Sequence, residues 1–441
     1  MLTTEQNDLL TRTGPGTPGG EYMRRYWLPA VLAEELPEPD CPPIRVKLLG
    51  EELVAFRDSN GRIGLLDEFC AHRRASLWLG RNEECGLRCV YHGWKYDVDG
   101  NCVDMMNEPE ELQFTSKVHL KSYPAVELGG LIWAYMGATD KMPPLPKFEW
   151  TQMPDTHRHV SKTWEECNWL QALEGGLDTS HAPIMHRRLR PEVARGGISP
   201  TSYFARGKAP IVEVDTTDYG YTYAGIRELA GEDSMLVRAY HYVMPFTQIR
   251  PSQFVGDDQY KPMIAGHYWV PMDDENCMVY NWRYVYGSHP LTQEQRYDDA
   301  AGPENTYIDR GYRKKRNRDN AWLIDRQVQR TETFTGIAGV NTQDHAVQES
   351  MGPIVDRSQE HLGPADKAII ALRQLLLRGV KTVQEGGDPP GLGQTYYWLR
   401  AIERVLPVGA DWRAELSDEL YEQAAAQLTP RGTDHEAEMS F

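Results

Sequence analysis

Two short stretches, Cys70-Ala71-His72 and Cys89-Val90-Tyr91-His92, decide how the first part of this 441-residue chain folds. Each stretch follows a strand-like run and precedes a turn, and 16 residues separate the two. Each supplies one thiolate and one imidazole, so two loops that face each other would close a four-ligand metal site. A structural zinc site is the simplest alternative, but zinc fingers prefer a cysteine pair followed by a histidine pair.

The mixed order of the ligands favours a two-iron cluster over zinc. In a Rieske [2Fe–2S] centre one iron is held by both cysteines and the other by both histidines, so each loop contacts both irons. The segments 70–74 and 89–96 closely resemble the Rieske loops of bacterial ring-hydroxylating oxygenases. We therefore expect Cys70, His72, Cys89 and His92 to hold one [2Fe–2S] cluster. Cys85 lies between the two motifs and is expected to be a small buried residue.

The surroundings of the loops predict the redox behaviour of the cluster. Respiratory-chain Rieske proteins carry an additional cysteine in each loop, and these two form a disulfide; neither loop here has one at the matching place. The chain is also acidic, with a formal net charge of −17. We therefore expect a reduction potential near the low end of the Rieske range, about −150 mV. Such a centre relays single electrons and does not itself transform a substrate.

A second group of ligand-type residues follows at Glu174, Asp178, His181 and His186. The first three are spaced i, i+4, i+7 and would share one face of a helix. On an unbroken helix the step to His186 would turn it about 140° away from His181. Pro183 is expected to displace the residue before it from helical geometry, so that the chain bends and both imidazoles reach one metal.

Two histidines and one carboxylate, with three positions left open, form the facial triad of non-haem Fe(II) oxygenases. The His-x₄-His spacing is a weak signal alone, but the run from Glu174 to His186 matches the mononuclear-iron motif of the ring-hydroxylating oxygenases. This resemblance gives Asp178 a bridging role, hydrogen-bonded to an iron-ligand histidine and to a Rieske histidine of a neighbouring subunit. The alternative for Asp178 is a carboxylate on the helix surface.

The third ligand of this motif must come from a distant part of the chain. The segment 340–350 resembles the region that carries the family's late aspartate, which assigns Asp344 as the ligand beside His181 and His186. Asp356 and Glu349 are the alternatives. His345 is expected to support the site or to lie at the surface.

The sequence pattern predicts an α+β protein of two parts. From about Ile44 to Gly137, short strand-like runs are separated by turn residues, with hairpins expected at 60–61, 96–102 and 126–135. The proline-rich segment 142–146 is expected to be a linker. The later part is expected to contain strands over 221–226, 235–244 and 278–286, and helices over 169–180, 366–379 and 414–428.

The similarity to the ring-hydroxylating oxygenases runs from Gly14 to Gly363 and looks most like the phthalate dioxygenase branch, whose enzymes are built from α subunits alone. It implies an antiparallel-β Rieske domain over residues 1–145, followed by a helix-grip catalytic domain, a curved antiparallel sheet with helices, over residues 146–441. It also implies a homotrimer or stacked trimers. In these, electrons cross from one subunit's Rieske centre to a neighbour's iron through Asp178.

The resemblance further implies a terminal oxygenase with one Rieske cluster and one mononuclear Fe(II) per subunit. A separate flavin/iron–sulfur reductase would pass electrons from NAD(P)H, because no Gly-x-Gly-x-x-Gly fingerprint is visible in this chain. Both atoms of O₂ would enter the ring of an aromatic carboxylate, of the phthalate, isophthalate or substituted benzoate class, to give a cis-dihydrodiol. The alternative is a Rieske monooxygenase that demethylates an O- or N-methyl aromatic compound.

A buried aromatic carboxylate needs a cation, and the planar fork of arginine matches a carboxylate bidentately. Arg206 and Arg238 lie on expected strands or their edges after the iron motif and are the candidate clamps, and Lys208 is a weaker one. The alternative for each is an ordinary solvated or salt-bridged residue.

Composition argues against several other classes. The net charge of −17 gives nucleic acids and anionic membranes little to attract. No stretch approaches the roughly 20 apolar residues of a membrane span, and the N-terminus lacks a basic region followed by an apolar one, so we expect a cytoplasmic protein. An electron carrier or a zinc-stabilised binding protein is the non-enzymatic alternative, but neither explains a second histidine–carboxylate group.

Overall fold

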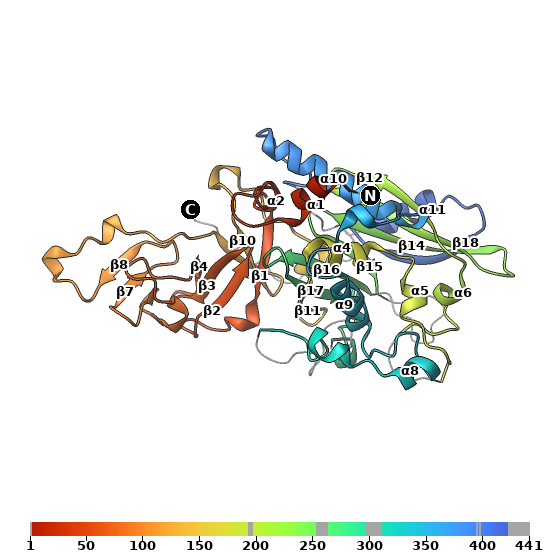
Figure 1. Cartoon of the computed structure of the whole chain (residues 1–441), viewed down its shortest axis with the longest axis horizontal. Coiled ribbons are helices and arrows are strands. Elements are labelled where there is room, and N and C mark those ends of the chain that lie inside the picture. Colours follow the sequence, from red (N-terminus) through yellow and green to blue (C-terminus); the bar gives the residue numbers. More distant parts are fainter. Residues whose placement is uncertain are drawn as a thin grey trace.

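The computed structural model describes residues 2–192, 197–252, 263–296, 311–393, 396 and 398–421. Small antiparallel sheets form the N-terminal part, and one large antiparallel sheet with helices forms the rest (Figure 1). The expected α+β class is therefore confirmed.

The N-terminal part contains three small antiparallel sheets. Their strands, in the order of pairing, are β1 (Trp27–Leu32), β10 (Leu131–Tyr135) and β9 (Ala125–Leu128); β2 (Ile44–Leu48), β3 (Glu51–Arg57) and β4 (Ile63–Asp67); and β5 (Arg81–Glu83), β6 (Gly86–Arg88), β7 (Trp94–Tyr96) and β8 (Cys102–Met105). The three expected hairpins join β3 to β4, β7 to β8 and β9 to β10. Gly61 (φ 81°) and Gly100 (φ 88°) occupy left-handed positions in the first two turns, which glycine adopts without the steric cost of a side chain.

Cys85 lies in the turn between β5 and β6, where its backbone also adopts a positive φ of 58°. It is partly exposed, and its backbone N–H donates to the hydroxyl of Ser59 over 2.9 Å. The expectation of a buried residue is therefore wrong, because the tight turn places this side chain at the edge of the small sheet.

Within the described part of the chain, the large sheet has eight antiparallel strands. In the order of pairing these are β11 (Arg158–Glu165), β17 (Cys277–Tyr284), β16 (Ile264–Pro271), β15 (Thr247–Pro251), β14 (Ser234–Val243), β13 (Gly220–Glu228) and β12 (Ile211–Thr216), while β18 (Ile402–Pro407) also pairs with β14. One edge of β14 is shared, because residues 234–239 pair with β18 and residues 241–243 pair with β15. The central strand β16 is buried along its whole length, as expected for a sheet covered on both faces.

Helices cover this sheet and connect it to the N-terminal part. Their bounds are α1 (Thr4–Thr11), α2 (Pro18–Met23), α3 (Glu149–Gln152), α4 (Trp169–Leu177), α5 (Ala182–Met185), α6 (Tyr203–Arg206), α7 (Gln293–Arg296), α8 (Arg326–Thr331), α9 (Val340–Ser350), α10 (Lys367–Gln384) and α11 (Trp412–Leu420). The first two pack against α10, so the N-terminal segment lies on the second part of the chain (Figure 1). The domain division at residue 145 stays a prediction.

Two helix boundaries differ from the expected ones. Helix α4 ends at Leu177 rather than Ser180. Helix α10 continues five residues beyond Gly379 to Gln384. Gly379 does not end the helix; it leaves room for α2 to pack closely, because a Cβ at this position would lie 2.6 Å from the ring of Tyr22. The expected end of the last helix, at residue 428, lies outside the described residues.

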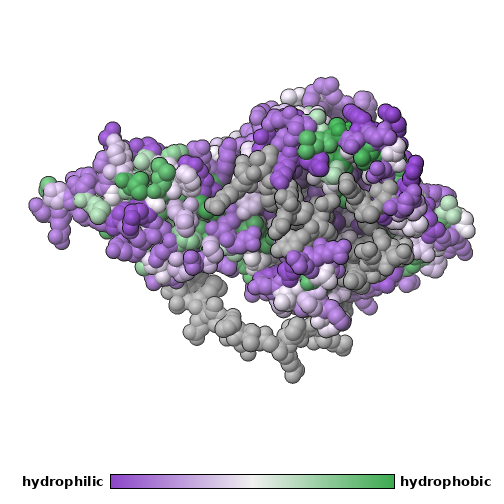
Figure 2. All heavy atoms as spheres, turned by 90° about the horizontal axis from the view of Figure 1, so that it is seen from below, coloured by the Kyte–Doolittle hydropathy of each residue, from purple (hydrophilic) through white to green (hydrophobic). Residues whose placement is uncertain are grey.

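The surface seen from below is mostly hydrophilic, with apolar patches both toward the end formed by the small sheets and over the opposite, larger part (Figure 2). None of the helices in the described part of the chain combines the length and apolar character needed to cross a membrane.

Candidate metal sites and substrate cavity

The two Cys/His stretches form matching turns at the tip of the small sheets. In one loop the N–H of Arg74 donates to the carbonyl of Cys70 over 2.9 Å, and in the other the N–H of Gly93 donates to the carbonyl of Cys89 over 2.9 Å. Both thiols are buried. The rings of His72 and His92 lie face to edge with their centroids 4.4 Å apart. The structure therefore brings the four sequence-predicted ligands into two facing loops.

The geometry of the four side chains fits a two-iron cluster better than one zinc ion. A tetrahedral zinc site would hold its ligand atoms about 3.5 Å apart. Within the described residues, no three of these four side chains form a group whose ligand atoms all lie within 4.8 Å of one another. The Nδ1 atom of His72 is buried and has no hydrogen-bond partner among those residues, which fits a nitrogen that binds a metal.

Hydrogen bonds around the first thiol favour its ligand form. The pKa of Cys70 is lowered to about 5, first by the hydrogen bond from the Cys89 thiol and then by that from the Tyr96 hydroxyl, whose oxygen lies 3.3 Å from Cys70 Sγ. The backbone N–H groups of His72 and Arg73 act in the same direction. The Cys89 thiol can no longer donate once both cysteines bind metal as thiolates, whereas the Tyr96 hydroxyl and the backbone N–H groups still favour the thiolate of Cys70.

The second site joins two segments that are far apart in the chain. Oδ1 of Asp344, on α9, lies 3.2 Å from Nε2 of His181 and 3.1 Å from Nε2 of His186. One ligand atom from each of the three side chains falls within a group 4.8 Å across, which is compact enough for a single metal ion. These two imidazoles and one carboxylate face a cavity. Such a set suits a mononuclear Fe(II) that keeps some of its coordination positions free.

The chain leaves helical geometry before the two histidines and not between them. Asp178 ends α4 in an extended conformation, and its Oδ1 accepts hydrogen bonds from the backbone N–H and the hydroxyl of Ser180, each over 2.6 Å. The residue before Pro183 lies inside the short helix α5, so the expectation that it leaves helical geometry is wrong. A proline in the first helical turn breaks no hydrogen bond, and His181 and His186 cap the two ends of α5, so the break at Asp178 precedes both histidines.

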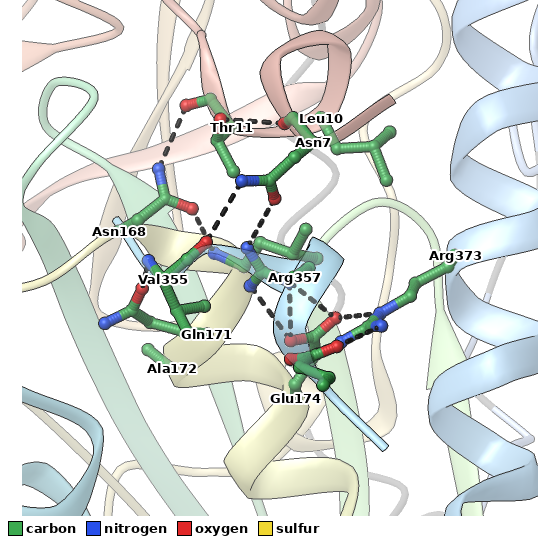
Figure 3. Close-up of polar contacts among 12 residues, drawn as sticks. Asn7, Leu10, Thr11, Asn168, Gln171, Ala172, Glu174, Val355, Arg357 and Arg373 are labelled. Atoms are coloured by element: carbon green, nitrogen blue, oxygen red, sulfur yellow. Dashed lines mark hydrogen bonds and ion pairs between the residues drawn. The ribbon is translucent and has the colours of Figure 1, made fainter. Parts of the chain in front are cut away.

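Glu174 does not face the metal site, contrary to the shared face expected for it. Its carboxylate accepts hydrogen bonds from Arg357 (2.9 Å) and Arg373 (2.6 Å) in the buried network of Figure 3. These guanidinium groups lower the pKa of Glu174 even though burial alone would raise it. The helix ends before His181, so the i, i+7 relationship to Glu174 is never formed.

The same network ties α4 to the N-terminal helix (Figure 3). Trp169 Nε1 donates to the carbonyl of Leu10 over 3.1 Å, and Asn168 Nδ2 donates to that of Thr11 over 2.9 Å. Arg357 also donates to Asn7 Oδ1 over 2.9 Å. The helix that leads into Asp178 and His181 is therefore anchored at its start by α1 and near its end by two arginines.

Asp178 lies beside the first histidine ligand. Its Oδ2 lies 3.3 Å from Nδ1 of His181, and about a fifth of the Asp178 side chain remains exposed. In the metal-free protein burial opposes a charge on His181, but hydrogen bonds to Asp178 and Asp344 outweigh it and raise the His181 pKa to about 10. Metal binding would therefore release a proton from this imidazole.

Sequence reasoning missed Gln343, whose Oε1 lies 2.9 Å from Nδ1 of His186. No motif singled it out, and its position directly before Asp344 was the one available signal. Of the alternatives to Asp344, Glu349 is paired with Lys314 in the interior, and Asp356 is exposed and caps the turn at Arg357–Gln359. The structure places neither in the metal-competent group.

His345 is buried and lines the same cavity as Asp344, so its expected supporting position, rather than the surface one, matches the structure. Its Nε2 lies 3.6 Å from Oε2 of Glu165. Burial is the main cause that raises the Glu165 pKa to about 8, so this carboxyl group is largely protonated at neutral pH.

A cavity of about 240 Å³ opens onto the His181–His186–Asp344 site. Among the described residues, three arginines line it: Arg238, Arg250 and Arg283, from β14, β15 and β17 of the large sheet. Apolar and aromatic side chains complete much of the wall, including Phe204, Tyr240, Trp269 and Val279. The cavity thus combines a metal-competent group, apolar walls and cationic side chains.

Only one of the two expected arginine clamps reaches this cavity. Arg238 is buried and lines it, and the guanidinium is held by the carboxylate of Glu403 and by the carbonyl of Pro251. Arg206 lies outside the cavity on an exposed turn of α6, where it pairs with Glu232 over 3.2 Å. Lys208 is also outside and pairs with Glu228 over 2.7 Å.

The fold and the two sites together define a class of protein with two metal centres. Two loops, each with one cysteine and one histidine, lie on the small antiparallel sheets. A group of two histidines and one carboxylate lies beside the large antiparallel sheet. The first arrangement suits electron relay and the second suits O₂ chemistry on a bound organic molecule.

Matches to two family models identify the family of the chain. The model described as Rieske [2Fe-2S] domain matches residues 26–124, and the model described as LigXa C-terminal domain like matches residues 134–435. The chain belongs to the Rieske ring-hydroxylating oxygenases, as an α subunit, and is an O₂-using oxidoreductase.

Curated relatives cover nearly the whole chain. It is 37% identical to the phthalate 4,5-dioxygenase oxygenase subunit of Pseudomonas putida, over 94% of both chains. It is 36% identical to the 3-chlorobenzoate-3,4-dioxygenase oxygenase subunit of Comamonas testosteroni, over 93% of this chain and 97% of the relative. It is 33% identical to the 5,5'-dehydrodivanillate O-demethylase oxygenase subunit of Sphingobium sp. (strain NBRC 103272 / SYK-6), over 92% and 86%.

The fold is shared with solved structures at much lower identity. Dicamba monooxygenase bound to dicamba superposes with a TM-score of 0.58 at 17% identity, over 82% of this chain and 98% of that one. At this identity the likeness supports the fold alone.

Proposed function

We propose that this chain is the terminal oxygenase that adds both atoms of O₂ to the ring of an aromatic carboxylate and gives a cis-dihydrodiol. The observation that carries the proposal is the cavity in which Arg238, Arg250 and Arg283 share the walls with the metal-competent group. Guanidinium groups in an apolar cavity favour an anionic ring compound, because a carboxylate can accept two parallel hydrogen bonds from one arginine. The phthalate and chlorobenzoate dioxygenase relatives support the same substrate class.

Different residues of the chain serve the two metal sites. Cys70, His72, Cys89 and His92 hold the Rieske cluster, and His181, His186 and Asp344 hold Fe(II), which supplies O₂ activation when bound. Asp178 orients His181, and Arg238 orients the substrate. The reaction consumes O₂, two electrons and two protons, and a separate flavin/iron–sulfur reductase draws the electrons from NAD(P)H.

We also propose that the active form is a homo-oligomer, a trimer or stacked trimers. The cluster loops next to β7 and the helices α5 and α9 lie in opposite halves of the molecule, which favours electron transfer from one chain to the Asp178 of another (Figure 1). Exposed apolar side chains on and around the loops, including Val90 and Tyr91, offer a surface for a neighbouring copy.

A demethylase is the second candidate. The 33% identity to an O-demethylase oxygenase subunit favours it. The same metal ligands would serve both reactions.

One experiment separates the two candidates. The iron-loaded protein is reduced without air and then exposed once to ¹⁸O₂ with each phthalate isomer, 3-chlorobenzoate or a methoxybenzoate. A dihydrodiol that carries two labelled atoms supports the dioxygenase, whereas formaldehyde with a phenol supports the demethylase. Absence of product with every carboxylate would contradict the proposed substrate class.

A further inference from the structure

We infer that Gln343 is a positioning residue that fixes the proton of His186 on Nδ1 and so leaves Nε2 free for the metal. The inference rests on the proposed iron site and adds to it a residue that supplies no ligand atom. Gln343 is buried on α9, and its Oε1 lies 2.9 Å from Nδ1 of His186.

The second contact of Gln343 determines which way its amide points. Nε2 of Gln343 lies 2.9 Å from the carbonyl oxygen of Ile337. A backbone carbonyl only accepts hydrogen bonds, so this end of the amide must be the NH₂ group. The other end, Oε1, is then the acceptor that faces His186.

The orientation of the amide in turn determines the tautomer of the histidine. Because Oε1 of Gln343 only accepts, Nδ1 of His186 must donate, and a neutral imidazole carries its single proton there. Nε2 of His186 is left with its lone pair toward Oδ1 of Asp344, 3.1 Å away. Two acceptor atoms at that distance repel each other unless a proton or a metal cation lies between them, and a metal ion bound there would take the place of that proton.

The two histidine ligands therefore have different partners behind them. Nδ1 of His181 faces the carboxylate of Asp178, whereas Nδ1 of His186 faces the neutral amide of Gln343. A carboxylate acceptor raises the donor strength of an imidazole more than an amide does. Gln343 thus orients His186 without making it as strong a donor as His181.

The test measures metal affinity rather than turnover. Protein that keeps its Rieske absorption is stripped of mononuclear iron with a chelator and titrated with Co(II), whose visible spectrum reports coordination. Gln343→Leu should lower the affinity about 10- to 100-fold, the usual effect of removing such a partner. Gln343→Glu keeps an acceptor toward His186 but places its other oxygen beside the Ile337 carbonyl, so it should bind Co(II) more tightly than Gln343→Leu without needing to match the wild type.

A matched control separates this role from general packing. Gln348 is a second buried glutamine on α9, and its Nε2 donates to the carbonyl of Ala172 over 3.4 Å. Gln348→Leu should leave the Co(II) affinity within about threefold, because the amide of Gln348 donates to the Ala172 carbonyl on α4 and not to a ligand histidine. The inference is overturned if Gln343→Leu binds as the wild type does, or if Gln343→Glu is weakened as much as Gln343→Leu. Failure of wild-type protein to bind Co(II) at all, with His181→Ala unchanged, would overturn the proposed iron site itself.

Discussion

Oδ1 of Asp344 lies within 3.2 Å of Nε2 of both His181 and His186, although Asp344 stands on α9 and the histidines flank the short helix α5. Burial alone would raise the pKa of this carboxyl group, but the two imidazoles hold it far below its usual range. Asp344 is therefore an anion at every physiological pH, as a metal ligand must be.

Asp344→Ala should abolish mononuclear iron and turnover while the Rieske absorption stays intact, because the cluster is held by a separate set of sheets. Iron is measured by a chelator assay before and after the cluster is destroyed with acid. Asp356→Asn is the control, since Asp356 is an exposed carboxylate outside the site. Unchanged iron content in Asp344→Ala would contradict the assignment.

Asp178→Asn should slow electron arrival at the mononuclear site more than it disturbs metal binding. The amide can still accept from Ser180, but it no longer offers His181 a carboxylate. We expect reoxidation of the reduced cluster in the presence of substrate and O₂ to fall about 10- to 100-fold, measured by stopped-flow absorbance. Retained iron with wild-type reoxidation kinetics would remove Asp178 from the electron path.

Arg238→Met should raise KM for the carboxylate substrate about 10- to 100-fold with a smaller effect on kcat, because a charge-assisted hydrogen bond is lost. Arg206→Met is the matched control and should leave KM unchanged, since Arg206 lies outside the cavity. Arg238 is also paired with Glu403, so the double variant with Glu403→Gln avoids a buried unpaired carboxylate. An unaffected KM in the folded double variant would exclude Arg238 as the clamp.

The cluster should titrate near −150 mV, at the low end of the Rieske range. Tyr96→Phe should lower the potential further by about 40 mV, because the hydrogen bond to Cys70 Sγ is worth about 1 kcal/mol and stabilises the reduced cluster. A redox titration followed by visible circular dichroism measures both values. A wild-type midpoint several hundred millivolts higher would contradict the first value, and a rise in Tyr96→Phe the second.

Glu165 should make the folded protein less stable as pH rises from about 5 to 8. Its pKa is raised to about 8 by burial, so between the unfolded and folded pKa values the native state holds a proton that the unfolded chain has lost. Each pH unit in this window should lower the free energy of unfolding by at most about 1.4 kcal/mol. Glu165→Gln should flatten this dependence in scanning calorimetry, whereas the exposed Glu228→Gln should not. An unchanged pH profile in Glu165→Gln would show that another group titrates there.

The local sequence was sufficient to predict features whose residues lie close together in the chain. The Cys70–Arg74 and Cys89–Tyr96 loops each bring a thiolate and an imidazole together within a few residues. The sequence alone therefore predicted that these residues form one metal site. The three hairpins of the N-terminal part were predictable for the same reason, because each turn is encoded by the residues that form it.

Tertiary structure decided everything that depends on long-range packing. The sequence spacing placed Glu174 with Asp178 and His181, but the helix ends at Leu177 and two distant arginines hold Glu174 in the interior. Arg206 and Arg238 were equivalent as sequence positions, and only the course of the sheet puts one in the cavity and the other on the surface. Gln343 belonged to no motif and its position directly before Asp344 was its one signal, because its role exists only once α9 lies against His186. Short sequence motifs thus identify the residues that bind the metals. The orientation of these residues, and which residues line the substrate cavity, depend on segments that meet only when the chain is folded.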